Sequence, residues 1–314
     1  MKKLSLVALS VLISSSAFAS AVLLEFTGKP SVTQNNKPLS VKSGAIFVDG
    51  VQFSADKKSS AQLMLESGAI IKVAGGQTYR VGDKTTKAQQ TGFIQGVQIA
   101  LNEVKQGGAN PTVHGMVKMG KPATGAKKQK VVSSAMFGVA GTYPIYTSIR
   151  KPGMPFTLMW SPESKITWTN PVLVVENAQK ERIFLEAIKP NQISLDACPC
   201  KMGLKPGEKY SWYLGQQNAD KVLPRSQRYP FTLLSSKAEA ALQTDLKTVE
   251  ALPLETAFAK DVLKAQVYFK YEMWDEMMKT LRPLHQAGEQ NLVSDLLFLG
   301  AAHMGLAKEA ELYR

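Results

Sequence analysis

The chain has 314 residues and a formal net charge of +13 at pH 7, with 38 Lys and Arg residues against 25 Asp and Glu residues. Its hydrophobic content of 44% is ordinary for globular proteins, and the length suggests two or three modules that each bury a core. No stretch after the N-terminal one is apolar enough to span a bilayer, which excludes an integral membrane segment in the mature chain. The positive charge either favours anionic partners or only keeps the chain soluble, and no nucleic-acid motif accompanies it.

The N-terminus has the pattern of an export signal. Two lysines precede an apolar run from Leu4 to Ile13, and small residues follow that end in Ala17-Phe18-Ala19. A retained membrane anchor is the alternative, but the apolar run is short for a spanning helix and has the wrong flank. The pattern therefore predicts a signal peptide over residues 1–19, a mature chain that begins near Ser20, and a periplasmic location.

Residues 20–107 begin with strand patterns. Apolar residues occupy alternate positions in two successive runs, at Ala61, Leu63 and Leu65, and at Ala69, Ile71 and Val73. A period of two predicts strands with one face toward a core. Between the runs, Glu66-Ser67-Gly68 predicts a tight turn, because Gly adopts positive φ without a steric penalty. We expect a compact antiparallel β module.

The same stretch is similar to a known family. The segment from Phe47 to Ser54, with its Asp49-Gly50 step, and the segment from Ser60 to Val73 resemble the FecR domain. That family combines a Gly-bounded strand, a step of Gly and Asp, and alternating aliphatic residues around a turn. The resemblance covers roughly residues 25–81 and implies an all-β FecR-like module, without implying any reaction.

A change of period marks the end of this module. Apolar residues recur at spacings of three and four and predict an amphipathic helix that caps the module: Phe93, Val97, Leu101 and Val104.

Residues 108–142 are rich in Gly, Pro, Ala, Ser and Lys and predict a basic linker. Five of its lysines are candidate contacts to an anionic partner, or else form a solvated run: Lys118, Lys121, Lys127, Lys128 and Lys130.

Short apolar runs separated by turn residues return in residues 143–235. They predict strands at 156–160, 172–175, 182–185, 193–195 and 229–233, at the intervals of a β-sandwich. A Pro206-Gly207 turn leads into a strand with Tyr210 and Trp212 on one face and Tyr213 on the other. This spacing predicts a tyrosine corner, in which a Tyr hydroxyl bonds back to upstream backbone.

The segment around this turn resembles fibronectin type III or immunoglobulin-like modules. The resemblance makes Trp160 and Trp212 core residues of the sandwich. Trp168 or Tyr213 could instead form an aromatic platform that binds a sugar, although most aromatic residues in such a sandwich fill its core.

Both cysteines of the chain lie together in this module as Cys198-Pro199-Cys200. One intervening residue does not match a thioredoxin motif, and no second pair completes a zinc site. We expect a disulfide in an oxidising compartment or a thiol pair, as a structural loop feature. Redox exchange and soft-metal capture remain alternatives, but the three histidines are remote in sequence.

Residues 236–314 have helical patterns. The capping box Ser236-Lys237-Ala238-Glu239 predicts a helix that runs toward Pro253. Later residues match the small, aromatic, small and large positions of a tetratricopeptide motif: Ala265, Tyr268, Met277 and Leu281. Ala310 follows Met277 by 33 residues, close to that repeat's period, and the resemblance implies tetratricopeptide-like hairpins. Because fewer than three repeats rarely stand alone, we expect the tail to lean on the sandwich, pair with another copy or dock a partner.

The motifs of enzymes are missing from the sequence. It has no nucleophile elbow, no His pair with metal spacing and no phosphate loop, so we predict a protein that is not an enzyme and has no cofactor or metal. The multi-domain pattern predicts an interaction or scaffold protein of the bacterial cell envelope that binds protein partners. Alternatives are binding of peptidoglycan or another wall carbohydrate, an accessory role in envelope signalling through a membrane protein, and a redox or hydrolytic enzyme.

Overall fold

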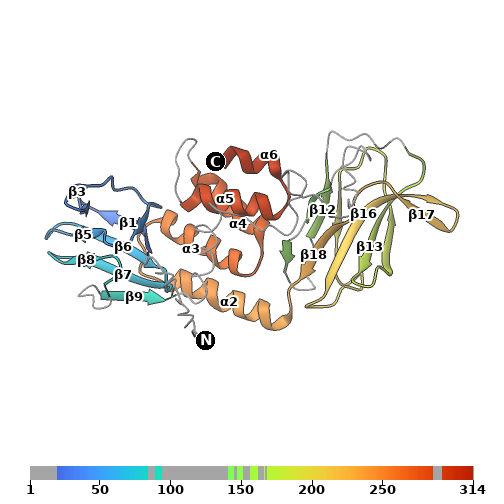
Figure 1. Cartoon of the computed structure of the whole chain (residues 1–314). Coiled ribbons are helices and arrows are strands. Elements are labelled where there is room, and N and C mark those ends of the chain that lie inside the picture. Colours follow the sequence, from blue (N-terminus) through green and yellow to red (C-terminus); the bar gives the residue numbers. More distant parts are fainter. Residues whose placement is uncertain are drawn as a thin grey trace, which may run out of the picture.

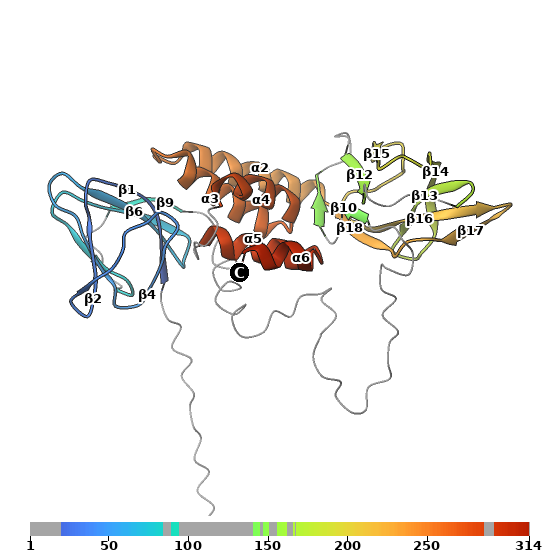
Figure 2. The same ribbon diagram turned by 90° about the horizontal axis from the view of Figure 1, so that it is seen from above.

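A computed structural model describes residues 20–83, 89–93, 141–144, 147–150, 156–161, 166, 168–285 and 292–313. Three units lie in a row along the molecule: the N-terminal β unit (described residues of 20–93), the helical region (described residues of 236–313) and the sandwich (described residues of 141–233) (Figure 1). The view from above shows the same order, with the helices between the two β units (Figure 2). The protein is therefore multi-domain and rich in β-structure, with helices at its C-terminal end, as predicted.

Several predicted features fall outside the described residues. These are the signal peptide, residues 108–140 of the linker with its five lysines, and all of the capping helix beyond Phe93. The last two residues of the predicted linker, Gly141 and Thr142, instead belong to strand β10 (Gly141–Tyr143). Phe93 itself ends a strand, β9 (Gln89–Phe93), which pairs with β7 (Ala69–Ala74). The predicted helix was expected to include Phe93, so this prediction is wrong at Phe93, which lies in an edge strand of the sheet.

The N-terminal β unit consists of two packed antiparallel sheets, ordered β4-β1-β6-β7-β9 and β3-β2-β5-β8. Apolar side chains from both sheets, among them Leu23, Phe53 and Leu63, fill the space between them. The remaining strands are β1 (Ser20–Thr27), β2 (Ser31–Gln34), β3 (Lys37–Pro38), β4 (Ile46–Val48), β5 (Gln52–Ser54), β6 (Ser60–Leu65) and β8 (Thr78–Arg80).

The β6–β7 hairpin confirms the period of two. Ala61, Leu63, Ile71 and Val73 are all buried in the core between the two sheets. The turn is also where it was predicted: Gly68 has a φ of 84° and its N–H donates to the Leu65 carbonyl at 2.8 Å.

The other face of the five-stranded sheet is covered by the helical region. Val22, Leu24, Met64 and Ile70 belong to one core cluster together with residues of the helices. Strand β1 is therefore buried on both faces, which explains why Val22-Leu23-Leu24 is continuously apolar instead of alternating. The helical region and the N-terminal β unit share one hydrophobic core.

The sandwich packs a three-stranded sheet, β10-β12-β15, against a six-stranded sheet, β11-β18-β16-β13-β14, in which β17 pairs with β16. Its strands are β10 (Gly141–Tyr143), β11 (Thr147–Ile149), β12 (Phe156–Trp160), β13 (Pro171–Asn177), β14 (Arg182–Ala187), β15 (Ser194–Ala197), β16 (Lys209–Asn218), β17 (Lys221–Pro224) and β18 (Tyr229–Leu233). Trp160 and Trp212 lie in its core with ring centroids 6.5 Å apart, as predicted.

The predicted tyrosine corner is present and is formed by Tyr210. Its hydroxyl accepts a hydrogen bond from the Lys205 backbone N–H at 2.6 Å and donates to the Glu208 carboxylate at 3.1 Å. These bonds fasten the loop around Gly207 to strand β16. Tyr210 and Trp212 share the core face, whereas Tyr213 lies on the opposite face, as the alternation predicted.

The helical region is a series in which each helix packs on the next along the chain. Its helices are α2 (Ser236–Ala251), α3 (Ala257–Lys270), α4 (Trp274–Leu281), the 3-10 helix η2 (Arg282–Leu284), α5 (Leu292–His303), α6 (Ala307–Ala310) and the 3-10 helix η3 (Glu311–Tyr313). Ala265, Met277 and Leu281 are buried, and Tyr268 packs against the same core.

The start of α2 differs by one residue from the predicted capping box. Ser235, not Ser236, is the N-cap, and its side chain accepts from the Ala238 N–H at 3.1 Å. Glu239 consequently does not close a capping box. It pairs instead with Arg150 of the sandwich, so a tertiary ion pair takes the place of the predicted local hydrogen bond.

Candidate functional site

The first junction of the helical region is built around a buried carboxylate. Glu25 in β1 is 5% exposed, and its carboxylate accepts hydrogen bonds from the Thr256 N–H and hydroxyl, both at 2.8 Å, and from the Glu255 N–H at 3.0 Å. Gln62 Nε2 donates to the same carboxylate at 3.0 Å and to the Pro253 carbonyl at 2.9 Å. Each of these described groups donates an N–H or O–H to the Glu25 carboxylate, which can only accept hydrogen bonds when it is ionised.

This carboxylate lies at the N-terminus of α3, whose N-cap is Thr256. Helix N-termini have unsatisfied N–H groups and a partial positive charge, so a carboxylate is favourable there. Glu25 thus caps a helix that is distant in the chain: its hydrogen bond with Glu255 joins residues 230 positions apart. The junction combines this polar contact with the shared apolar core.

The second junction joins the sandwich to the loop between α3 and α4. The Ser148 N–H and the Thr147 hydroxyl both donate to the Glu272 carbonyl, at 2.8 and 3.2 Å. Arg150 extends the contact, with Nε and a terminal nitrogen 3.1 and 2.7 Å from Glu239 Oε1 on α2. The bond to Glu239 raises the pKa of Arg150 against the opposing effect of burial. Strand β11 is therefore fastened to α2 and to the α3–α4 loop.

A cavity of about 390 Å³, here called the junction pocket, lies at this second junction. Its lining includes residues of β10, β11 and β12 of the sandwich, residues of α3 and α4, and Met273 of the loop between these two helices. Tyr143, Phe156 and Tyr268 supply aromatic rings, and Asp275 and Glu276 supply carboxylates. The pocket exists only because the sandwich and the helices meet here, and no local motif of the sequence indicates it.

Burial and nearby carboxylates raise the pKa of both tyrosine hydroxyls of the junction pocket. Burial, followed by the charges of Asp275 and Glu276, raises the pKa of Tyr143 well above its ordinary value. Burial and the charge of Glu276 likewise raise the pKa of Tyr268, although Arg150 opposes this effect. Both hydroxyls are protonated at neutral pH, as tyrosine hydroxyls ordinarily are, and each can donate one hydrogen bond.

The two cysteines form a disulfide within the sandwich, in the turn that follows β15. The Cys198 carbonyl accepts from the Lys201 and Met202 N–H groups, and Cys200 is exposed. Within the described residues, no group of three or more His, Cys, Asp or Glu side chains is arranged to hold a metal ion. The disulfide is thus part of a tight turn, and neither cysteine lines the junction pocket.

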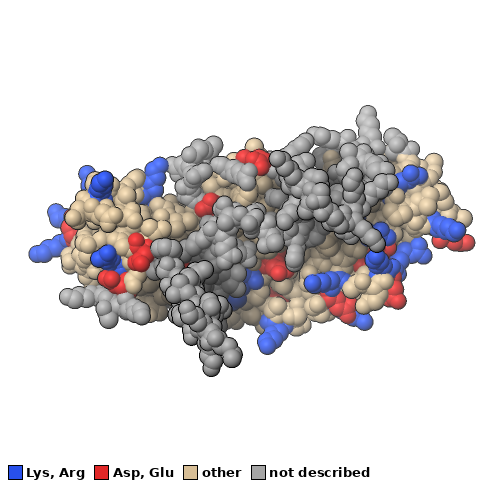
Figure 3. Space-filling model, viewed as in Figure 1, with Lys and Arg blue, Asp and Glu red and all other residues tan. Residues whose placement is uncertain are grey.

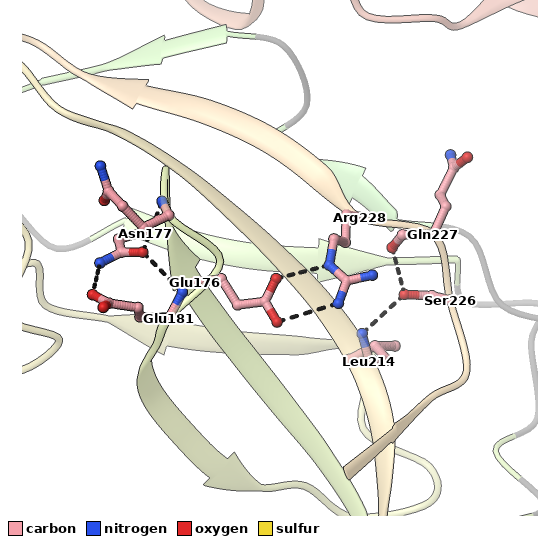
Figure 4. Close-up of polar contacts among 8 residues, drawn as sticks. Glu176, Asn177, Glu181, Leu214, Ser226, Gln227 and Arg228 are labelled. Carbon is pink, nitrogen blue, oxygen red and sulfur yellow. Dashed lines mark hydrogen bonds and ion pairs between the residues drawn. The ribbon is translucent and has the colours of Figure 1, made fainter.

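Of the two aromatic residues considered for sugar binding, Trp168 is partly buried and Tyr213 is buried. Trp168 packs against the sandwich core, and Tyr213 is only 5% exposed. The guanidinium of Arg228 covers the Tyr213 ring, 4.7 Å from its centroid, and also pairs with the buried carboxylate of Glu176 at 2.7 Å. Figure 4 shows the Glu176 and Arg228 side chains pointing toward one another across the sheet. Tyr213 is therefore excluded as a sugar platform by this cation–π contact and its burial.

Charges are mixed on the visible surface of both β units, where basic and acidic side chains lie interspersed (Figure 3). The five lysines predicted to contact an anionic partner lie outside the described residues. In the described part of the chain, no helix has the length and apolar character needed to cross a membrane.

Comparison with known proteins finds little similarity. No protein-family model matches the chain, and no curated protein matches it. Among solved structures, the crystal structure of CopC from Methylosinus trichosporium OB3b is similar to 31% of this chain and 95% of that chain, with 12% sequence identity and a TM-score of 0.23.

Proposed function

We propose that this chain is a non-enzymatic scaffold protein of the periplasm that presents two β units to protein partners of the cell envelope. The observation that carries the proposal is the shared core between the N-terminal β unit and the helices. Together with the Glu25 cap and the Glu272 and Arg150 contacts, it supports one continuous body in which the helices hold the two β units apart. Such an arrangement suits simultaneous binding at two ends.

The module resemblances fit this proposal. We interpret the N-terminal β unit as FecR-like, the sandwich as a fibronectin type III or immunoglobulin-like module, and the helical region as tetratricopeptide-like hairpins. Modules of these kinds hold other molecules through their surfaces. The helices are largely engaged by their own chain, so partner contacts are expected mainly on the β units.

Exposed apolar side chains indicate where to test for partners. Val48 in edge strand β4 and Leu223 in β17 are 48% and 44% exposed and belong to opposite β units. A photo-crosslinking amino acid placed at either position should capture defined envelope proteins in the producing bacterium. The matched controls are the exposed positions Lys57 and Lys180 in the same units.

The same experiment separates the proposal from its main alternative. Protein adducts at Val48 or Leu223, absent at the control positions, would support the scaffold. If all four positions give no protein adduct while the purified chain sediments with peptidoglycan, the protein binds the wall polymer instead. Sedimentation lost at moderate salt would attribute that binding to charge alone.

A further inference from the structure

The junction pocket has the size and position of a small-molecule site. Its volume of about 390 Å³ falls in the range of roughly 300 to 1,000 Å³ that ligand pockets have, and such pockets favour the junctions between domains. The wall on one side belongs to the sandwich and the wall on the other side to α3 and α4. A molecule bound there would contact both units.

Two carboxylates of this pocket, Asp275 and Glu276, share one lysine. This lysine is Lys279, with its Nζ 2.6 Å from Asp275 Oδ2 and 3.5 Å from Glu276 Oε1. The other cation of the lining, Arg150, is bonded to Glu239 at 2.7 Å. Among its described residues, the lining therefore has two carboxylates and two cations, but Glu239, outside the lining, offsets the charge of Arg150, so Lys279 alone among them faces both Asp275 and Glu276. The helical region has more acidic than basic residues although the whole chain carries +13.

The pocket already holds an ammonium group against an aromatic ring. Lys279 Nζ lies 5.5 Å from the centroid of the Tyr143 ring, near the limit of about 6 Å for a cation–π contact. Burial lowers the pKa of Lys279, but Asp275 and Glu276 together raise it above the ordinary value. The Lys279 side chain is 55% exposed, so another cation can replace it without removing a buried side chain.

We propose that the junction pocket binds a small organic cation. Its ammonium group would contact the Tyr143 ring and the carboxylates of Asp275 and Glu276, and its carbon body would pack on Phe156 and Met159. The inference rests on the cavity, the aromatic rings and the two carboxylates that share Lys279, and it is independent of the proposed scaffold function. The ligand class is an amine or a quaternary ammonium compound.

Choline and its neutral carbon isostere, in which carbon replaces the nitrogen, are the probes that test this inference on the full mature chain. Titration followed by amide chemical shifts should show saturable binding of choline, with shifts at Ser148, Glu276 and Lys279. The neutral isostere should bind at least about threefold more weakly, because it lacks the cation–π and ionic contacts. Putrescine in place of choline distinguishes primary amines from quaternary ammonium groups.

Variants then separate charge from shape. Glu276→Gln should weaken choline binding by about threefold, whereas Lys279→Met should strengthen it by a similar factor, because the competing internal cation is removed. Tyr143→Leu should abolish the difference between choline and its isostere, and Tyr143→Phe, which keeps the ring, should retain it. Glu186→Gln on exposed strand β14 removes the same charge at a distance and should change nothing.

Equal binding of choline and the neutral isostere would overturn the inference, as would the absence of saturable shifts with choline and putrescine. If Tyr143→Leu fails to fold, the opposite effects expected for Glu276→Gln and Lys279→Met still decide the question, since both side chains are well exposed.

Discussion

The residue that most clearly joins distant parts of this chain is Glu25. A carboxylate buried to 5% exposure ordinarily carries a large desolvation cost. Here the Thr256 and Gln62 donors and the N-terminus of α3 compensate that cost. The side chain therefore specifies the position of the helical region on the N-terminal β unit.

Substitution of Glu25 tests this role. Glu25→Gln replaces one acceptor oxygen with an NH2 group that faces donors, and we expect it to lower the free energy of unfolding by about 2 to 3 kcal/mol. The neighbouring Glu255→Gln, on an exposed side chain, should stay within about 0.5 kcal/mol of the unmodified protein. Urea unfolding followed by circular dichroism measures both. Equal effects of the two variants would show that Glu25 has no special role.

Asp295 on α5 predicts a pH dependence. Burial raises its pKa, and no ionic or hydrogen-bonding partner among the described residues opposes this effect. Its protonated form is thus favoured in the folded state, so its contribution is favourable below the unfolded-state pKa of about 3.9 and is lost as the pH rises through the raised value. Asp295→Asn should therefore be more stable than the unmodified protein at neutral pH and should lose that advantage in acid. The exposed Asp220→Asn is the control, and an unchanged difference across pH would contradict the prediction.

At the scale of elements, the five-stranded sheet is buried on both faces. Its inner face packs on the second sheet of its own unit, and its outer face packs on the helices through Val22, Leu24, Met64 and Ile70. Helix α3 also contacts β1 directly. Removal of residues 234–314 would expose this apolar outer face to solvent. A deletion of the tail would therefore lower the stability of the N-terminal β unit, and any loss of partner binding could follow from that instability.

Met64→Ala measures what this outer face contributes. Met64 is fully buried against the helical region, and we expect the substitution to lower the free energy of unfolding by about 2 to 4 kcal/mol. Met159→Ala, at a position that is 41% exposed in the sandwich, is the matched control and should cost less than about 0.5 kcal/mol. A negligible cost for Met64→Ala would mean that the helices do not cover this sheet in solution.

At the scale of the whole molecule, three units are joined by two different junctions. The first is a continuous apolar core with a polar cap, and the second is a set of hydrogen bonds and an ion pair around β11. The first should be the more resistant to opening, because burial of apolar surface is the larger stabilising effect. The row of units in Figure 1 is the geometry that these junctions maintain.

Spin labels at the two ends test whether this geometry is rigid. Lys37→Cys in β3 and Lys221→Cys in β17 place labels on exposed positions of opposite units, and both native cysteines are engaged in a disulfide. A single narrow distance distribution is expected from double electron–electron resonance. Adding Arg150→Ala should broaden it by weakening the second junction. A broad distribution without that change would contradict the continuous body.

Local patterns predicted much of the secondary structure. The period of two located β6 and β7, Gly68 located their turn, and the Pro-Gly turn with its tyrosine located the corner formed by Tyr210. These features depend on residues that are close together in the chain or on one strand. Their physical causes are positive φ and the alternation of side chains between the two faces of a strand, and both are visible in the sequence.

Other features were decided by the tertiary structure. The helical tail leans on the sandwich, which was one of the expected outcomes, but it also packs on the N-terminal β unit, which was not expected. The Glu25 cap and the junction pocket join residues more than 100 positions apart, and the pairing of Glu239 with Arg150 replaced a predicted local cap. Such contacts form only where packed units bring side chains together, and no spacing along the chain encodes them. Sequence alone thus determined many of the strands and helices, such as β6, β7 and α2, and packing decided which of their faces and charges meet.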